Sequence, residues 1–355
     1  MSLSDYERDE WKRLTKKREK PVRASSRKIL PVVAKQTMSN VVDTAKRFPT
    51  PTLEAVTGPW EVAANGLGNF IATAAAHSTS AESVVAQYAK AGHDVADLEA
   101  IRALDLRAID SVANIDRLGW RHSGTAALFG ISAGAAISGA EVMLAKGSIA
   151  GEGAKRAPSF TVVAGAMTAD LAATLALAAR SVSSIATWYG FDPRQPEEQV
   201  FIMSVLRLGM ATGQSAKTAA YFEVSQLSQM LFRNATWEKL SEKVLTKIVQ
   251  QFATQASVNL TKKKLGQVVP VAGIAVGAGM NATLIQRVSK AADAAYRERF
   301  LLEKSGGTLV MNAPVEPTAA DADRGMSVIE LVRDGGALPQ IEAPTQTGRK
   351  NDKSG

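Results

Sequence analysis

Apolar residues recur along most of this chain at spacings of three and four positions, the period of an amphipathic α-helix. One such run starts near Val95 and continues through Leu98, Ile101, Leu104, Leu106, Ile109, Val112 and Ile115. Other predicted helices cover residues 1–20, 30–48, 81–91, 160–189, 197–210, 216–232, 236–260 and 287–304. No segment shows the alternation of apolar and polar residues that indicates a β-strand. The sequence therefore predicts an all-α fold, a bundle of many helices.

Two long segments without charged residues differ from this amphipathic pattern. They cover residues 123–140 and 265–285. Each contains two glycines in a GxxxG spacing, at Gly130 and Gly134 and at Gly273 and Gly277. Uncharged segments of this length are candidates for membrane-spanning helices, but Gly, Ala, Ser and Thr gain little by leaving water. We interpret the two segments as a buried, glycine-rich central hairpin, with membrane insertion as the alternative.

A third apolar segment, residues 160–189, contains one acid and one base, Asp170 and Arg180. It ends in the sequence Tyr189, Gly190, Phe191, Asp192 and Pro193. Glycine adopts the positive φ of a helix C-terminus, and proline cannot continue a helix that it closely follows. A new helix then begins with Glu197 and Glu198, where the helix dipole favours negative charge. The pattern predicts a break between two buried helices.

Composition divides the chain into three parts. Residues 1–29 form a basic amphipathic N-terminal arm, and residues 30–304 contain the predicted helical domain. Residues 305–355 are rich in Gly, Pro, Ala and Thr, which predicts a disordered tail. Within this tail only residues 326–332, MSVIELV, are apolar enough to fold or dock. The alternative for this short apolar motif is a transient helix without a docking site.

Two absences in the sequence bear on its chemistry and its compartment, and the lack of cysteine leaves the compartment itself open. The chain contains no cysteine, which excludes disulfides, thiolate metal sites and cysteine nucleophiles. Residues 1–30 are charged throughout and have no apolar core of the kind that a secretory signal peptide requires. We therefore expect a cytoplasmic protein.

Positive charge is concentrated near the N-terminus. The chain has a formal net charge of +8, and residues 1–28 contain ten Lys or Arg against five Asp or Glu. The most basic stretch includes Lys12, Arg13, Lys16, Lys17 and Arg18. Each basic residue near an anionic lipid surface contributes about 1 kcal/mol to binding. These five residues therefore predict a contact with an anionic membrane surface. A solvated, salt-bridged helix face is the alternative.

Signatures of known catalytic sites are scarce. The three histidines are not spaced as zinc ligands, and neither a GxxxxGK[ST] phosphate loop nor a GxSxG elbow occurs. We expect no cofactor and no metal. Asp170 is the strongest single candidate, because a buried acid needs a cationic partner or has a task of its own. Arg180, Arg297 and Lys290 are its candidate partners. A structural ion pair and a pocket beside the turn both remain open.

The apolar segment with Asp170, its YGFDP ending and Glu197-Glu198 resemble the EcsC family. The resemblance extends over residues 98–304. It includes the glycine-rich Pro270-Val271-Ala272-Gly273, Gly279-Met280-Asn281, the closing RERFLLEK of residues 297–304, and Tyr6-Glu7 and Glu10-Trp11 in the arm. The family is bacterial and takes its name from a gene beside an ABC transporter. The resemblance therefore implies a membrane-linked setting, and it implies no particular reaction.

These inferences favour a non-enzymatic accessory protein, cytoplasmic and attached peripherally at the inner face of the cell membrane. The expected partner is an anionic membrane surface or a membrane protein complex. Nucleic acid is not expected, because no recognition module accompanies the basic arm. The alternative is a soluble ligand-binding protein or an enzyme with a pocket near Asp170 and the YGFDP turn.

Overall fold

The computed structural model describes residues 3–19, 70–115, 160–233, 237, 239–265, 273–309 and 327–337. Within these ranges the regular elements are helices and no strand is present, which confirms the predicted all-α bundle. The helices are α1 (Asp5–Glu19), α4 (Phe70–Ala76), α5 (Ala81–Lys90), the 3₁₀ helix η1 (Glu99–Ala103), α6 (Leu106–Ala113), α8 (Phe160–Trp188), α9 (Pro196–Met210), α10 (Gln214–Phe232), α11 (Glu242–Leu265), α12 (Gly273–Lys304) and α13 (Val328–Asp334).

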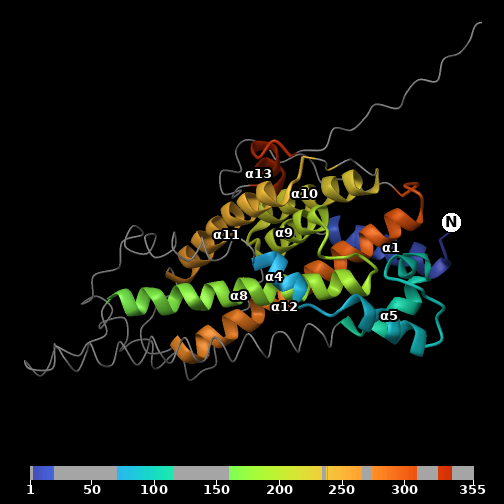
Figure 1. Cartoon of the computed structure of the whole chain (residues 1–355), viewed down its shortest axis with the longest axis horizontal. Helices are drawn as coiled ribbons and strands as arrows, with labels where there is room; N and C mark the ends of the chain where they lie inside the picture. Colours follow the sequence, from blue (N-terminus) through green and yellow to red (C-terminus); the bar gives the residue numbers. More distant parts are fainter. Residues whose placement is uncertain are drawn as a thin grey trace, which may run out of the picture.

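Three helices, α8, α9 and α12, form the centre of the molecule. The two longest, α8 and α12, lie side by side along the long axis (Figure 1), and α12 also packs on α9. Gly209 of α9 makes the closest approach, since a Cβ atom there would lie 2.6 Å from the Cα atom of Val288 on α12. Any larger residue at position 209 would push the two helices apart.

The break between α8 and α9 is built as the sequence predicts. Gly190 has a φ of +84°, and the N–H of Phe191 donates to the carbonyl oxygen of Ala186 at 3.0 Å. This bond closes the last turn of α8 in the manner of a glycine-terminated helix. Helix α9 then starts with Pro196 at its first position, where the missing N–H is not needed.

Two elements differ from the sequence prediction. The run from Val95 to Ile115 is interrupted, because Leu104 is extended and Asp105 caps α6 by accepting a hydrogen bond from the N–H of Arg107 at 2.9 Å. In addition, residues 273–285 of the glycine-rich segment and the closing helix form one continuous helix, α12. Residues 123–140, the other half of the predicted hairpin, lie outside the described residues, so the hairpin stays a prediction.

The remaining helices surround this centre. Helix α1 packs on α12 and α6, and α10 and α11 pack on α9. Helix α13 lies against α10 and α11 (Figure 1). The largest fully buried side chains are aromatic and include Tyr88, Tyr189, Tyr296, Phe201 and Phe300. The division of the chain into an arm, a domain and a tail stays a prediction, although both α1 and α13 are docked on the helical body.

Candidate functional site

The turn at the end of α8 is filled by its own side chains. Gly190 lies against η1, where a Cβ atom would come 2.7 Å from the carbonyl oxygen of Leu98. Phe191 is 3% exposed. The guanidinium carbons of Arg299 and Arg102 lie 4.0 Å and 5.4 Å from the centre of its ring, within the range of cation–π attraction. The glycine and the phenylalanine of this motif therefore join α8, η1 and α12.

Two buried tyrosines bring carboxylates to the same region. The hydroxyl of Tyr189 donates to Asp293 at 2.7 Å, and that of Tyr296 donates to Glu198 at 2.6 Å. Burial raises the pKa of both phenols well above its ordinary value, and the negative charge of each acceptor adds to the effect. Arg299 also donates to Glu198 at 2.7 Å. Both phenols therefore act as permanent donors at neutral pH.

The acid of the YGFDP motif has a local partner. Asp192 accepts hydrogen bonds from the backbone N–H of Arg194 at 3.0 Å and from its guanidinium at 2.9 Å. Burial alone would raise the pKa of Asp192, but the bonds from Arg194 outweigh it and lower that pKa below its ordinary value. The geometry of the turn accounts for this acid without a ligand.

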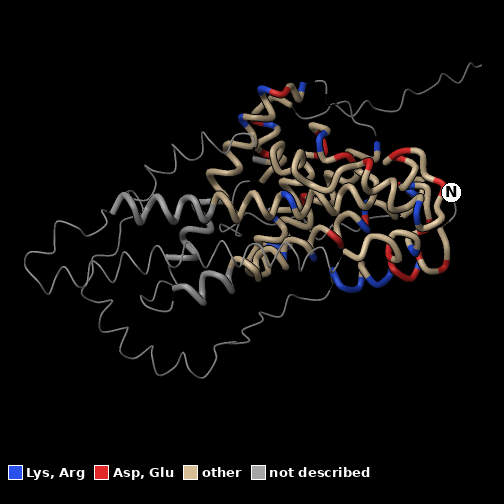
Figure 2. Tube along the Cα trace, turned by 60° about the horizontal axis from the view of Figure 1, so that its bottom comes forward, with Lys and Arg blue, Asp and Glu red and all other residues tan. Residues whose placement is uncertain are grey.

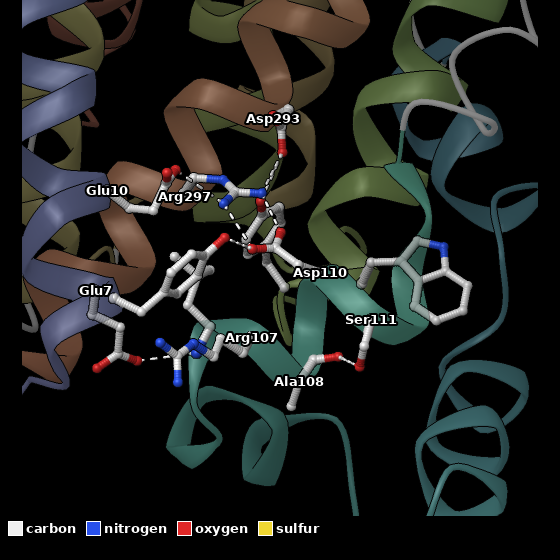
Figure 3. A network of polar contacts seen from close by, with 12 residues as sticks. Glu7, Glu10, Arg107, Ala108, Asp110, Ser111, Asp293 and Arg297 are labelled. Carbon is white, nitrogen blue, oxygen red and sulfur yellow. Dashed lines mark hydrogen bonds and ion pairs between the residues drawn. The ribbon is translucent and has the colours of Figure 1, made fainter.

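Arg297 of α12 joins three helices. It pairs with Asp110 of α6 through both terminal nitrogens, one of them at 3.0 Å, and Nη1 lies 3.3 Å from Glu10 of α1. Asp293, one turn away on α12, is 3.7 Å distant. The hydroxyl of Tyr6 on α1 donates to Asp110 at 2.6 Å. Figure 3 shows Glu10, Asp110 and Asp293 around Arg297. One cation thus holds carboxylates from α1, α6 and α12 together.

Two further ion pairs hold α1 on α12. Glu7 is fully buried, and its carboxylate accepts hydrogen bonds from Lys304 at 2.6 Å and from the N–H of Leu106 at 3.0 Å. At the other end of α1, Arg18 pairs with Glu298, and the two side chains are only 7% and 5% exposed. Burial raises the pKa of Glu298, although Arg18 acts in the opposite direction. Buried ion pairs therefore hold α1 on α12.

The opposite face of α1 is charged throughout. Among the side chains of α1 that the structure describes, residues 5–18, the exposed ones are Asp5, Arg8, Asp9, Lys12, Arg13, Lys16 and Lys17, five cations against two acids. The whole helix is nearly balanced, with six cations and five acids. Glu7 pairs with Lys304 of α12, and Glu10 lies between Arg297 of α12 and the exposed Arg13, 2.6 Å away. Arg18 is also turned inward, and the side chain of Glu19 lies outside the described residues. Charged residues of both signs gather at this end of the molecule (Figure 2). Folding gives α1 a positive outer face.

Sequence comparison decides the family. The family model described as "EcsC protein family" matches residues 3–301, which is most of the chain. The chain belongs to the EcsC protein family. The resemblance carried by the YGFDP turn and the closing helix is thereby confirmed.

One curated relative of this EcsC protein is "Uncharacterized protein YdbA" of Bacillus subtilis (strain 168), 27% identical over 140 residues. The matched region covers 39% of this chain and 48% of the relative, so the chain spans about half the length of the curated relative. The two chains are therefore similar over part of their lengths. No solved structure matches the chain.

The residues predicted to form a buried pair in this EcsC protein lie in different places. Asp170 is part of α8, but its side chain lies outside the described residues. Arg180, on the same helix, is exposed to solvent. Arg297 pairs with Glu10 and Asp110, as described above. Whether Asp170 has a cationic partner stays a prediction.

The predicted membrane contact divides into two groups. Lys12, Arg13, Lys16 and Lys17 lie on the exposed face of α1. Arg18 is buried against Glu298.

Sequence reasoning missed the acids that hold α1 in place. Glu7 and Glu10 carried a weak signal, because they fall on the same helical face as Trp11 and Leu14, at spacings of four. An acid on an apolar face indicates a buried cation opposite it, but the position of that cation cannot be read from the local sequence.

Two further properties of this EcsC protein bear on its function. Among the helices of the described ranges, none has both the length and the hydropathy that crossing a membrane requires. Within the same ranges, His, Asp and Glu side chains form no group of three that could hold a metal ion.

Proposed function

We propose that this protein is a non-enzymatic accessory protein that attaches peripherally to an anionic membrane surface through α1. The observation that carries the proposal is the positive outer face of the docked helix. Its last turns expose Lys12, Arg13, Lys16 and Lys17, while Asp5 and Asp9 lie in its first turns and Glu7 and Glu10 pair with α12. A surface of this kind matches the negative potential of the cytoplasmic leaflet.

The way α1 is held supports this proposal. A flexible basic segment would lose conformational entropy on reaching a surface, whereas α1 is already ordered by its pairs with α12. Its cations also protrude, since the side chain of Lys12 is 76% exposed and that of Arg13 is 57% exposed. A preformed, protruding cationic face favours attachment to a lipid surface over a single small ligand.

The non-enzymatic part of the proposal rests on the YGFDP turn. Phe191 fills the space beneath the turn, and the carboxylates of Asp192, Glu198 and Asp293 each have a partner within the fold. These contacts favour a structural role for the motif over a pocket that takes a substrate. A membrane protein complex with an acidic cytoplasmic face is the second candidate partner, because the same four cations would serve it.

The test is cosedimentation of the full chain with vesicles that contain phosphatidylglycerol. Replacement of Lys12, Arg13, Lys16 and Lys17 by Gln removes four cations and keeps long side chains on the helix. At about 1 kcal/mol per cation the partition coefficient should fall by about 10³-fold. High salt should release the unaltered protein, because dissolved ions screen the attraction between the cations of α1 and the anionic lipids.

A matched control carries the same loss of charge elsewhere. Lys90, Lys243, Lys247 and Lys290 are exposed on α5, α11 and α12, and their replacement by Gln should leave vesicle binding within a few-fold of the unaltered protein. Equal losses in the two quadruple variants would mean that overall charge, and not α1, drives binding. Binding that resists both high salt and the α1 substitutions would contradict peripheral attachment and favour insertion. If vesicles bind nothing, the acidic protein partner becomes the better candidate.

A further inference from the structure

The short apolar motif of the C-terminal segment folds as α13 and docks on the body of the protein. Its side chains Val328, Ile329, Leu331 and Val332 are between 0% and 6% exposed, and Ala337 just beyond the helix is 1% exposed. The intervening Glu330, with Arg333 and Asp334, faces solvent. Helix α13 contacts α9, α10 and α11. We call the surface that receives it the α13 groove.

The α13 groove contains one charged anchor. Glu223 of α10 is 2% exposed, and its Oε2 atom accepts hydrogen bonds from the N–H of Val328 at 2.9 Å and from the hydroxyl of Ser327. The carboxylate thus meets the free N–H groups at the start of α13, where negative charge is favoured. This contact fixes both the position and the direction of the docked segment.

The anchor belongs to the body and not to the segment. Arg207 of α9 donates to Glu223 Oε2 at 3.0 Å, and the hydroxyl of Ser204 donates to Oε1 at 2.7 Å. These bonds come from α9 and would persist without α13. The α13 groove is therefore a preorganised receptor for the start of a helix.

The segment depends on the groove for its own structure. Helix α13 has seven residues, and a helix of this length is not stable alone in water even with a capping box, which Ser327 and Glu330 form here. Four aliphatic side chains must offset the entropy lost on ordering the whole segment, so docking is a small difference between opposing terms. Residues 310–326 separate Ser327 from the end of the α12 region, which leaves chain enough for the segment to leave and return.

We propose that the α13 groove is a helix-docking site whose occupant, residues 327–337 of this chain, exchanges on and off. The C-terminal segment is a removable cover over a surface of α9, α10 and α11 that includes the apolar Val244 and Ile248 of α11. The groove selects a Ser that caps the helix, two apolar residues, one outward acid and two more apolar residues. A protein segment of that pattern competes with the cover for the same place.

A designed disulfide tests the exchange in the full chain. A Cβ atom at Gly335 would lie 3.3 Å from Cγ1 of Val244 on α11, and Gly335 has an ordinary φ of −73°. Val244→Cys with Gly335→Cys therefore places one sulfur near the position that a disulfide requires. The chain has no other cysteine, so the pair can form only this bond within one molecule.

The readout is the binding of a fluorescent peptide of residues 324–340, followed by anisotropy. The oxidised variant should bind no peptide, and the reduced variant should bind it as the unaltered chain does. Val332→Asp places a carboxylate in the groove and should undock the cover, so that the full chain binds the unaltered peptide roughly tenfold more tightly or better. Arg333→Asp, one position away on the outward face, is the matched control and should bind as the unaltered chain does.

Three results would overturn the proposal. Equal peptide binding by the oxidised and reduced chains would show that the peptide binds elsewhere. A folded Val332→Asp chain that fails to bind the peptide would show that the groove does not accept a helix from outside. Loss of helical circular dichroism across the whole Val332→Asp chain would show that α13 is an integral part of the core and no exchangeable cover.

Discussion

Helices α1 and α13 lie near opposite ends of the chain and dock on the same helical body by opposite means. Helix α1 turns three ionised side chains inward, Glu7, Glu10 and Arg18, and finds their partners on α12. Helix α13 turns four aliphatic side chains inward and meets a single carboxylate of the body. The contact of α1 combines buried Leu14 and partly buried Tyr6 and Trp11 with three inward charges, whereas that of α13 is almost entirely apolar.

The two kinds of contact should respond differently when one side chain is replaced. A buried ion pair repays little more than the cost of removing both charges from water, but losing one partner leaves an uncompensated charge inside the protein. An apolar contact weakens in proportion to the area that is lost. The attachment of α1 should therefore be all or nothing, whereas that of α13 should be graded and reversible.

The largest effect should come from Glu7→Gln. The substitution keeps the shape of the side chain but leaves Lys304, whose side chain is only 8% exposed, without its carboxylate. The free energy of unfolding in urea should fall by about 3–5 kcal/mol. The control is Asp9→Asn on the outer face of α1, where the pair with Lys12 is exposed and contributes less than about 1 kcal/mol. Similar losses in both variants would refute the contrast between the two faces.

A smaller effect is expected from Leu331→Ala in α13. Truncating a buried leucine ordinarily costs about 2–5 kcal/mol. Here α13 can leave the groove while the rest of the protein stays folded. The loss in global stability therefore cannot exceed the free energy of docking, and we expect it to be less than about 2 kcal/mol. Hydrogen exchange of the α13 amides should rise while the amides of α8 and α12 stay protected. Exchange that rises equally everywhere would mean that α13 and the core unfold as one unit.

The smallest effect is expected in the pH dependence of stability, to which a carboxyl beside α1 contributes and the apolar contact of α13 does not. Burial alone would raise the pKa of Asp105, beside α1, but the N–H of Arg107, the hydroxyl of Ser4 and the charge of Lys304 together lower it below its ordinary value. A carboxyl whose pKa is lower in the folded state stabilises the fold above its unfolded pKa, near 3.8, and loses that contribution as pH falls through the folded pKa. Asp105→Asn should therefore flatten the loss of stability with pH below about 4.

The comparison variant for that titration is Leu331→Ala. It removes no titratable group, so its unfolding free energies should run parallel to those of the unaltered chain across the acid range. An unchanged slope in Asp105→Asn would show that this carboxyl contributes nothing to acid unfolding.

The elements that the sequence predicted correctly are those with local causes. Gly190 and Pro193 end one buried helix and separate it from the next, because glycine conformation and proline chemistry act within a few residues. The interruption at Leu104 was missed for a related reason. Apolar spacing continues through it, while Asp105 offers α6 a new N-terminus by bonding to the N–H of Arg107.

The contacts that could not be predicted join distant parts of the chain. Glu7 and Lys304 are separated by 297 positions, and Ser327 and Glu223 by 104. Each residue alone looks like an ordinary surface charge or hydroxyl, and only the packing of α12 and α10 brings the partners together. The basic residues of α1 illustrate the same limit, since local sequence does not distinguish Arg18, which is buried, from Lys17, which is exposed.

The inward turn of Glu7 and Glu10 has a consequence for the proposed attachment to an anionic membrane surface. The outer face of α1 is positive only when the helix is docked. A detached α1 would expose its acids together with its bases and would be nearly neutral. Attraction to an anionic surface would then begin only when α1 is seated on α12. A chain in which α1 is not docked would then bind the surface weakly. Only completely folded molecules would attach.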